Sequence, residues 1–589
     1  MAVAVTLVRM KIAILRHSAK GQRGGMMTSG GILGLLLAGG TIFLAFQGGD
    51  WLAAAYAVWM LGWIIGPVFS GGDETLRPEF FSLVGLPAPR LAAGLLVSAF
   101  VGVAPVISLI ALAGLVAAAA PGNALVAVPA MVLQLAIFVL LSKVAVAVLG
   151  IALRSRVGAI GAGLINGAVL AFLGQAWVFA VTFGQGGQIP AFVRYLPSGW
   201  GLLAVRGEYL ALLSMAVLIV LLLAAWAALL ARRTGASRPS TRGRRPMRAA
   251  TAREAVVAKE LRTWSRDLVR NYQLTFALAY GVFFAGAPLA LGITGMLPLA
   301  GPIFIMMASA MTANSYGTDG TAHWLTLMTP GASDVRGRQL AWLLAVGPVA
   351  LALAVAFTLA VDGPWPLVLA ATFALLGGGA GMVPLISVYG LVPGTDPRSR
   401  SGNPLRTSED DGAMTGVVYL TLFLVALTAA PAVLVTSLFG WWGVVAGAVT
   451  GVLCYWGLGL LASRRLAARG PELLQLMRTG RRPESGSSLF KMPELSKTEQ
   501  TIAMICWSFG AIPLVPQGVL AAVFVSTGRL RMSWFLATYM PPGLRWPTAA
   551  LMILLGLTMY GVGLWIPYRA RKRAASAKAA TVQGLNHTA

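Results

Sequence analysis

Residues 210–231 read LALLSMAVLIVLLLAAWAALLA and contain no charged side chain. About 20 consecutive apolar residues are enough to cross the hydrocarbon layer of a membrane as a helix. Arg232 and Arg233 follow directly, and basic residues concentrate on the cytoplasmic side of membrane helices. This stretch therefore predicts a transmembrane helix, with bounds near 208–231, that ends in the cytoplasm.

Composition extends this prediction to the whole chain. Of the 589 residues, 57% are hydrophobic and only 11% are charged, whereas soluble domains contain about 25% charged residues. The mean hydropathy of +0.78 leaves too few polar residues to cover a water-soluble surface. The two cysteines, Cys454 and Cys506, lie in apolar runs, which argues against a disulfide framework and against a cysteine-based zinc site.

The same length criterion predicts fourteen membrane-spanning helices and hence an all-α polytopic membrane protein. The predicted ranges are 31–47, 51–70, 91–119, 124–151, 157–183, 208–231, 273–293, 297–313, 339–361, 365–392, 415–437, 441–463, 499–525 and 546–567. Several contain proline or glycine, which a bundle tolerates because neighbouring helices pack around the irregular backbone.

The basic residues sort by membrane side. With the N-terminus in the cytoplasm, 39 of the 45 Lys and Arg residues fall in inner segments. The outer segments hold Arg194, Arg206, Arg529, Arg531 and Arg545, and Lys143 lies within a span. This asymmetry predicts two cytoplasmic termini and attributes most of the net charge of +26 to topology, so we expect no nucleic-acid partner. The excess of Arg over Lys and the abundant Gly are typical of GC-rich bacterial genomes, which favours the bacterial cytoplasmic (inner) membrane.

The sequence offers few groups for chemistry. No Asp or Glu lies deep in a predicted span, whereas ion-coupled carriers generally need buried carboxylates. Lys143, near the inner end of its helix, is better explained by snorkelling. There is no Gly-x-x-x-x-Gly-Lys-Ser/Thr phosphate loop, and the three histidines are scattered. We therefore expect no catalytic residue, no bound metal and no cofactor on this chain, and an external source of energy for any transport.

Short motifs recur at offsets of 243 to 246 residues. The matched pairs are the segments 154–158 (RSRVG) and 398–402 (RSRSG), Pro87 and Pro330, Gly94 and Gly337, and Asp73 and Asp319. Each pair has the same topological place, which predicts two halves of six spans. Because the number of spans in each half is even, the repeats are expected to be parallel.

The predicted organisation has six parts. They are a first transmembrane half with an N-terminal interfacial helix at 1–240, a cytoplasmic linker and interfacial helix at 241–272, a second half at 273–470, a basic cytoplasmic loop at 471–498, an appended two-helix hairpin at 499–567 and a basic cytoplasmic tail at 568–589. Residues 232–250 are rich in Arg, Ser and Gly, and this composition predicts a flexible linker near anionic lipid headgroups.

Two stretches resemble helices that lie in the membrane interface. In 252–270, Val257, Leu261, Trp264 and Leu268 recur at helical intervals with basic residues between them, which predicts an amphipathic helix. Residues 7–16 (LVRMKIAILR) have a similar composition before the first span. Ordinary basic flanks explain either stretch alone equally well, but their equivalent placement favours paired interfacial helices.

Residues 314–338, NSYGTDGTAHWLTLMTPGASDVRGR, resemble a loop of the permease subunits of bacterial type-2 ABC exporters, in their fused two-half form. That loop has the pattern Asn-x-x-Gly-x-Asp-Gly, and Arg338 stands where the family has Lys. Residues 72–94 look like the equivalent loop of actinobacterial members. Lys259 to Arg262 with Arg266 and Asp267 are similar to the family's elbow helix, and LPSGW at 196–200 resembles a further feature. The resemblance covers about residues 1–470, so the hairpin departs from the family plan.

The resemblance implies that two copies of a separate ATPase subunit, which would bind ATP and Mg, drive the permease. The loop after the second span of each half would then carry a coupling helix that docks on the ATPase. The implied coupling residues are Asp73, Glu74, Pro87, Gly94, Asn314, Gly317, Asp319, Gly320, Pro330 and Gly337, and the implied elbow residues are Lys259, Glu260, Arg262, Arg266 and Asp267. For any single residue, helix capping, helix termination or close helix packing is an equally available role.

A substrate path is expected between the two halves. Candidate lining residues are Trp177, Phe283, Phe284, Trp365 and Tyr419, although aromatic residues at such positions more often pack against lipid or the core. Weakly charged spans suit a small amphiphilic cargo, and the resemblance suggests efflux of a drug, an antibiotic or a lipid-like compound. Two alternatives stay open: a fourteen-span secondary drug antiporter, and a membrane-embedded enzyme or assembly subunit that transports nothing.

Overall fold

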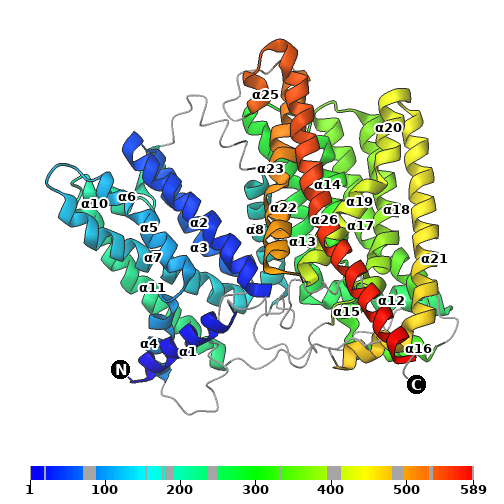
Figure 1. Cartoon of the computed structure of the whole chain (residues 1–589), viewed down its shortest axis with the longest axis horizontal. Coiled ribbons are helices and arrows are strands. Elements are labelled where there is room, and N and C mark those ends of the chain that lie inside the picture. Colours follow the sequence, from blue (N-terminus) through cyan, green and yellow to red (C-terminus); the bar gives the residue numbers. More distant parts are fainter. Residues whose placement is uncertain are drawn as a thin grey trace.

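The computed structural model describes residues 2–18, 22–48, 50–69, 88–152, 155–175, 178, 191–235, 248–329, 334–393, 413–479, 495–526, 528 and 535–586. Within these ranges every regular element is a helix (Figure 1). Among these residues, eleven helices are long and apolar enough to cross a membrane, or up to thirteen if each of two bent pairs is one span. The prediction of an all-α, multi-pass membrane protein is confirmed.

These segments, together with the shorter apolar helix Trp51–Gly66, fall one each on the fourteen predicted ranges. The two bent pairs fall on 91–119 and 297–313, with bends of 60° and 51°. The first bend lies next to Gly102, and Pro105 stands in the first turn of the new helix. Proline is tolerated there because a backbone N–H in the first turn has no carbonyl partner within the helix. The sequence predicted the positions of both spans but neither bend.

The elements up to residue 235 begin with a short helix at the N-terminus and continue with long apolar helices. They are α1 (Ala2–Ser18), α2 (Gln22–Gln47), α3 (Trp51–Phe69), α4 (Ala88–Ala99), α5 (Val103–Leu112), α6 (Gly114–Ala117), α7 (Ala124–Ala152), α8 (Arg156–Gly174), η2 (Ala191–Tyr195), α10 (Trp200–Val205) and α11 (Leu210–Gly235). A core around Tyr56, Leu112, Leu115, Phe138 and Leu202 joins α3, α5, α6, α7 and α10.

The next elements repeat the pattern of a short helix followed by long ones. They are α12 (Ala252–Arg266), α13 (Leu268–Gly286), η3 (Ala287–Leu291), η4 (Leu297–Leu299), α14 (Ala300–Met311), α15 (Ser315–Asp319), η5 (Gly320–His323), α16 (Trp324–Leu327), α17 (Asp334–Ala360), α18 (Trp365–Tyr389), α19 (Ala413–Thr428), α20 (Ala430–Phe439) and α21 (Trp442–Thr479).

The last elements fall on and beyond 499–567, the range predicted as an appended hairpin. They are α22 (Lys497–Phe509), α23 (Ala511–Leu514), the π-helical η6 (Val515–Leu520), α24 (Ala521–Ser526), α25 (Leu536–Tyr539) and α26 (Pro542–Asn586). α26 packs against α22, α23 and η6, and Arg573 donates a hydrogen bond to Glu499 Oε1 at 2.6 Å. The hairpin therefore has its own internal contacts.

α18 is the innermost helix of the second group. Its glycines lie against α21, and a Cβ atom added at Gly381 would be 2.5 Å from the carbonyl oxygen of Cys454. Gly377 and Gly451 approach even more closely. Small residues allow helix backbones in a membrane to touch. The two helices therefore pack backbone against backbone over several turns.

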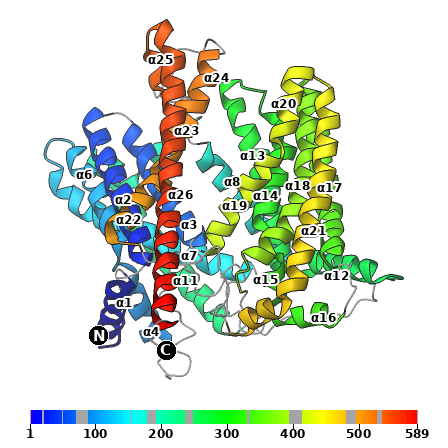
Figure 2. The same ribbon diagram turned by 45° about the vertical axis from the view of Figure 1, so that its right-hand side comes forward.

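α8 belongs to the first group by sequence but packs along α13 of the second (Figure 2). Asn166 donates a hydrogen bond to the Tyr272 hydroxyl at 3.0 Å. A Cβ atom at Gly163 would lie 2.6 Å from the Tyr272 carbonyl oxygen. This close seam connects the two groups of helices.

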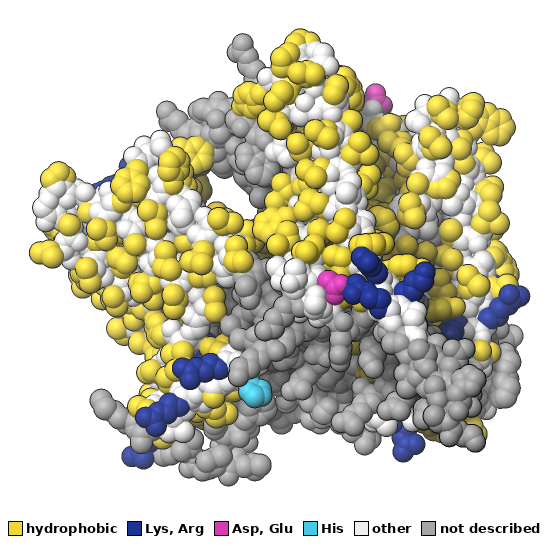
Figure 3. All heavy atoms as spheres, viewed as in Figure 1, with side chains coloured by type: hydrophobic (Ala, Val, Ile, Leu, Met, Phe, Trp, Pro, Cys, Tyr) yellow, Lys and Arg dark blue, Asp and Glu magenta, His cyan; other side chains and the backbone are white. Residues whose placement is uncertain are grey.

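The two ends of the bundle differ in their charged contacts. At one end, Asp50 forms ion pairs with Arg194 at 3.8 Å and Arg206 at 3.6 Å. At the other end lie α1, α12 and α16, together with both described chain ends (Figures 1 and 2). Hydrophobic side chains cover the surface between the ends, and most of the visible Lys and Arg side chains lie toward the second end (Figure 3). Arg194 and Arg206 thus pair with Asp50 at the first end, whereas α1, α12 and α16 lie at the second (Figure 1).

Candidate functional site

The predicted elbow is made of two helices rather than one. The Thr251 side chain caps α12 by accepting a hydrogen bond from the Glu254 backbone at 3.2 Å. α12 ends at Arg266, and Asp267 has extended backbone geometry. The Asp267 carboxylate accepts a hydrogen bond from the Val269 nitrogen at 3.1 Å and so caps α13. The single helix predicted over 252–270 is therefore wrong, because Asp267 starts a new helix.

The segment after α14 turns away from the span and folds as α15, η5 and α16. Asn314 fixes the turn: its Nδ2 donates to the Val392 carbonyl at 2.8 Å, and the Val392 nitrogen donates to its Oδ1 at 3.3 Å. Gly317 lies against the same two residues, so a Cβ atom would clash with them. Gly320 has φ +58°, a conformation that favours glycine. Three of the predicted coupling residues therefore determine the shape of this segment.

Arg338 on α17 lies at the centre of an ion cluster. Its Nη1 is 3.1 Å from Glu260 Oε1 of α12, its Nε donates to Asp334 Oδ2 at 2.9 Å, and its Nη2 pairs with Asp319 of α15. Lys259 donates to Asp319 Oδ2 at 2.9 Å and to Glu260 Oε1 at 3.2 Å. Three segments that are far apart in sequence meet at these five residues, which we call the Arg338 cluster.

The Arg338 cluster is buried. The side chains of Arg338, Glu260 and Asp334 are 4%, 5% and 6% exposed, while Lys259 at 49% forms its outer edge. Removing two charges from water costs several kcal/mol per ion, which their attraction offsets only when the geometry is good. The guanidinium has a different carboxylate near each of its three nitrogens, and it donates hydrogen bonds from Nε to Asp334 and from Nη2 to Asp319. We conclude that α12, α15 and α17 hold one another in a defined position.

Aromatic and basic neighbours surround the cluster. The guanidinium of Arg338 lies 4.2 Å from the centroid of the Tyr316 ring, and the Tyr316 hydroxyl donates to Asp334 Oδ2 at 2.6 Å. The buried Arg270 donates from Nη2 to Thr318 Oγ1 at 3.0 Å and stacks over Trp264. These contacts attach α15 to α13 as well as to α17.

Gly337 lets α12 approach α17. A Cβ atom at this position would lie 2.6 Å from Cβ and Cγ1 of Val256. Gly94 plays the same part for α4 and α1, because its Cβ atom would lie 2.6 Å from Leu7 Cδ1. Gly94 and Gly337, which the sequence pairs at an offset of 243 residues, therefore each make room for the short helix at the start of their group. This shared packing role is one that the sequence left open.

The contact between α1 and α4 is mainly apolar. Leu7 and Leu95 belong to one buried cluster with Ala147 and Trp226. The exception is Lys11, which is 6% exposed and donates a hydrogen bond from Nζ to the carbonyl oxygen of Ser98 at 2.9 Å. Ser98 stands in the last turn of α4, where carbonyls lack helical partners and attract positive charge. Lys11 thus caps the helix before the 60° bend.

A patch of apolar side chains is exposed beside the cluster. Trp324 and Leu325 of α16 are 50% and 54% exposed, and Met328 just after it is 70% exposed. In Figure 1, α16 lies at the end of the bundle that carries α12 and α15. Exposed apolar patches at such places mark surfaces that bind another molecule. We call these three residues the α16 patch.

Some of the remaining predicted site residues lie outside the part of the chain that the structure describes. Asp73, Glu74, Pro87, Trp177 and Pro330 are outside the described residues, as are Arg154 and 398–402 of the repeated motif. In the elbow, Arg262 is half-buried and Arg266 is exposed.

The described substrate-path candidates lie on three helices, α13, α18 and α19. Phe283 packs on Phe172 with ring centroids 5.4 Å apart, and Phe284 stacks on Tyr280 at 5.2 Å. Trp365 begins α18, and Tyr419 is 68% exposed on α19.

Sequence reasoning named Lys259, Glu260 and Asp319 in two separate sites and did not assign a site role to Arg338 or Asp334. Their spacing of four residues places them on one helical face, which was the available signal. Their partners on α12 and α15 were not visible without the fold. Among the described residues, no group of three His, Cys, Asp or Glu side chains is arranged to hold a metal ion.

Comparisons with protein-family models, with curated proteins and with solved structures find no match for this chain. The arrangement of its own residues therefore has to carry any functional conclusion.

Proposed function

We propose that the chain is the membrane-spanning permease of an ATP-driven exporter of the ABC class, powered by two copies of a separate ATPase subunit. Residues 1–240 and 273–470 would be its two parallel six-helix halves. The expected cargo is a small amphiphilic compound such as a drug or an antibiotic. ATP hydrolysis would take place on the partner, with this chain supplying the path.

The observation that carries the proposal is the Arg338 cluster. It ties the folded segment Ser315–Leu327 to α12 on one side and to α17 on the other. A force applied to this segment would move both helices together, because buried ion pairs do not slide past one another easily. Transport driven by a docked subunit needs such a rigid connection between the docking surface and the spans.

The α16 patch supports a docking surface beside the cluster. The three side chains of the α16 patch are at least half exposed. In contrast, the neighbouring side chains of Tyr316 and His323 are buried. Tryptophan is enriched among the residues that dominate binding energy at protein interfaces. The patch and the predicted coupling residues Asp319 and Gly320 belong to one continuous segment.

Equivalent packing in the two groups supports a two-half design. α1 lies against Gly94 of α4, and α12 lies against Gly337 of α17. Each pair joins a short basic helix to the helix that follows a predicted coupling loop. Paired connections of this kind suit a machine in which two subunits act on two halves.

Purification of the tagged chain from its host in mild detergent tests the proposal. We expect an ATPase with a phosphate loop to co-purify at two copies per permease. Trp324→Ala combined with Leu325→Ala should lower its recovery at least about tenfold, as for loss of an interface hot spot. The matched control combines Trp441→Ala with Leu438→Ala, residues that are similarly exposed, at 62% and 66%, at the opposite end.

A chain that purifies alone, under conditions that preserve known complexes, would overturn the proposal. Uncoupler-sensitive transport would then indicate the secondary drug antiporter, and no transport would indicate an assembly subunit. Equal ATPase recovery from both double variants would place the docking surface away from α16.

A further inference from the structure

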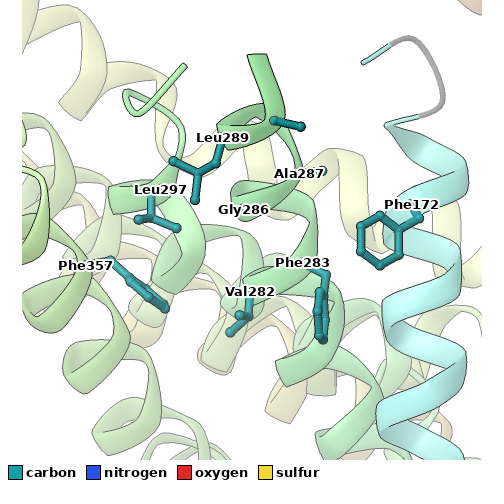
Figure 4. A pocket seen from close by; sticks show the side chains of 9 residues that line it. Phe172, Val282, Phe283, Gly286, Ala287, Leu289, Leu297 and Phe357 are labelled. Carbon is teal, nitrogen blue, oxygen red and sulfur yellow. The ribbon is translucent and has the colours of Figure 1, made fainter. Parts of the chain in front are cut away.

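A cavity of about 450 Å³ lies between α8, α13, η3, η4 and α17 (Figure 4). It is at the end of α13 remote from the Arg338 cluster. The lining residues are all apolar: Phe172, Val282, Phe283, Gly286, Ala287, Leu289, Ala290, Leu297 and Phe357. Figure 4 shows Phe172 and Phe283 facing each other across the two helices.

The cavity arises because α8 and α13 diverge. At Gly163, an added Cβ atom would meet the Tyr272 carbonyl oxygen at 2.6 Å, so the two backbones touch. At Gly174, further along, the nearest atom is on the Phe284 ring at 3.0 Å, and a side chain separates the helices. At Gly286, an added Cβ atom would meet nothing within 4 Å. The helices therefore form a wedge that is closed at one end and open at the other.

The chemistry of the wedge restricts its occupant. No lining side chain carries a charge or a hydrogen-bonding group, and apolar cavities bind apolar molecules rather than water. The volume falls within the range of about 300–1,000 Å³ that is typical of ligand sites. A headgroup, or the polar part of an amphiphilic cargo, would find no partner there.

The position of the wedge points to the bilayer as the source of the occupant. α8, α13 and α17 each belong to a segment long and apolar enough to span a membrane. Phe172, Phe283 and Leu289 remain 38%, 42% and 43% exposed, so the cavity is open rather than sealed in the core. Hydrocarbon chains of lipids surround membrane-spanning helices, and they match the apolar lining of the cavity.

We propose that this cavity binds one acyl chain of a membrane phospholipid, which fills the wedge between α8 and α13. The lipid chain completes the packing of the seam that connects the two groups of helices.

Gly286 provides a direct way to fill the cavity. Its backbone has helical angles, φ −82° and ψ −28°, which leucine adopts readily. Because an added Cβ atom has no neighbour within 4 Å, Gly286→Leu should occupy the wedge without a clash. The matched control is Gly457→Leu on α21, where the glycine is also helical and free of neighbours within 4 Å.

The test uses the full chain in lipid nanodiscs that contain a phospholipid with a diazirine in one acyl chain. After irradiation, mass spectrometry locates the labelled peptides. We expect labelling of the peptides that contain Phe172 and 283–289. Gly286→Leu should reduce it at least about fivefold, equivalent to roughly 1 kcal/mol of lost binding, while Gly457→Leu leaves it unchanged. Labelling of α21 peptides that do not contain residue 457 is the internal reference.

Two outcomes would overturn the inference. One is equal labelling of the wedge peptides in the wild-type chain and in Gly286→Leu when both unfold at the same temperature. The other is labelling of these peptides by a diazirine-bearing alkyl cation but not by the phospholipid, which would assign the cavity to a cargo-like amphiphile. If Gly286→Leu unfolds the protein, its loss of labelling says nothing about the cavity. Gly286→Ala is then used instead, and it should give a smaller decrease in a folded chain.

Discussion

The two short basic helices, α1 and α12, hold their neighbours by different means. α12 is joined to α17 and α15 by buried charges around Arg338. α1 is joined to α4 by apolar packing around Leu7 and by one ammonium group, that of Lys11. Charge-assisted hydrogen bonds require a defined geometry, whereas apolar contacts tolerate small shifts. The comparison indicates that the interface of α12 transmits position more strictly than the interface of α1.

The strongest way to break this comparison is Arg338→Met. It leaves Glu260, Asp319 and Asp334 buried with no guanidinium between them, and removing one partner of buried ion pairs costs about 3–5 kcal/mol. We expect a loss of this size in the free energy of unfolding, measured with SDS in mixed micelles. Adding Glu260→Gln and Asp334→Asn should restore part of it. A stability equal to that of the wild type would mean that the cluster does not hold the interface.

Alanine at the two matched glycines sharpens the comparison. Gly337→Ala would push Cβ into Cβ and Cγ1 of Val256, a stiff β-branched side chain close to the backbone. Overpacking of this kind costs about 1–3 kcal/mol. Gly94→Ala would meet only the flexible end of Leu7, so we expect a smaller loss in the same assay. Val256→Gly, which removes both clashing atoms, should restore part of the stability lost in Gly337→Ala. Equal losses at both glycines would contradict the difference.

Lys11→Met tests the hydrogen bond between α1 and α4. The substitution keeps the length of the side chain but removes the donor to the Ser98 carbonyl. We expect a loss of about 1 kcal/mol, because the lost hydrogen bond is partly offset by burying one charge fewer. Lys11→Arg, which keeps the charge, is the control. A loss as large as that of Arg338→Met would show that α1 also depends on charge.

The smallest effect is expected for Lys259→Met. Lys259 is half exposed at the edge of the Arg338 cluster, and exposed ion pairs contribute about 0–1 kcal/mol. The remaining loss should disappear in high salt, because salt screens exposed charges more than buried ones. Persistence of a large effect at 1 M salt, a concentration at which the screening length is about 3 Å, would show that Lys259 is part of the buried core.

Local sequence patterns predicted the spans well but not the cluster. Apolar length alone locates a helix, and so eleven of the fourteen ranges coincide with described helices that are long and apolar enough to cross a membrane. The helix break at Asp267 had a local signal, an acidic residue in front of an apolar run, and it was missed. The contacts of Arg338 with Glu260 and Asp319 join residues 78 and 19 positions away, so only the tertiary fold brings them together.

The pairing of α8 with α13 was also beyond the sequence. A repeat predicts that each half packs mainly with itself, yet α8 lies along the second group of helices. The glycines at 163 and 167 fit any close helix pair and do not specify a partner. The predicted path residue Phe283 was therefore placed correctly on its helix, while its neighbour Phe172 was not identified.

The order of synthesis gives the α18–α21 contact a further consequence. α18 is the most enclosed candidate span, with 78% of its most apolar window buried, yet its close partner ends 90 residues later at Thr479. At about 5–20 residues per second, the ribosome needs roughly 5 to 20 seconds to make that length. During this time the glycine face of α18 is in the membrane without α21. A larger side chain at Gly377 would therefore leave the insertion of α18 intact and block the docking of α21 that follows it.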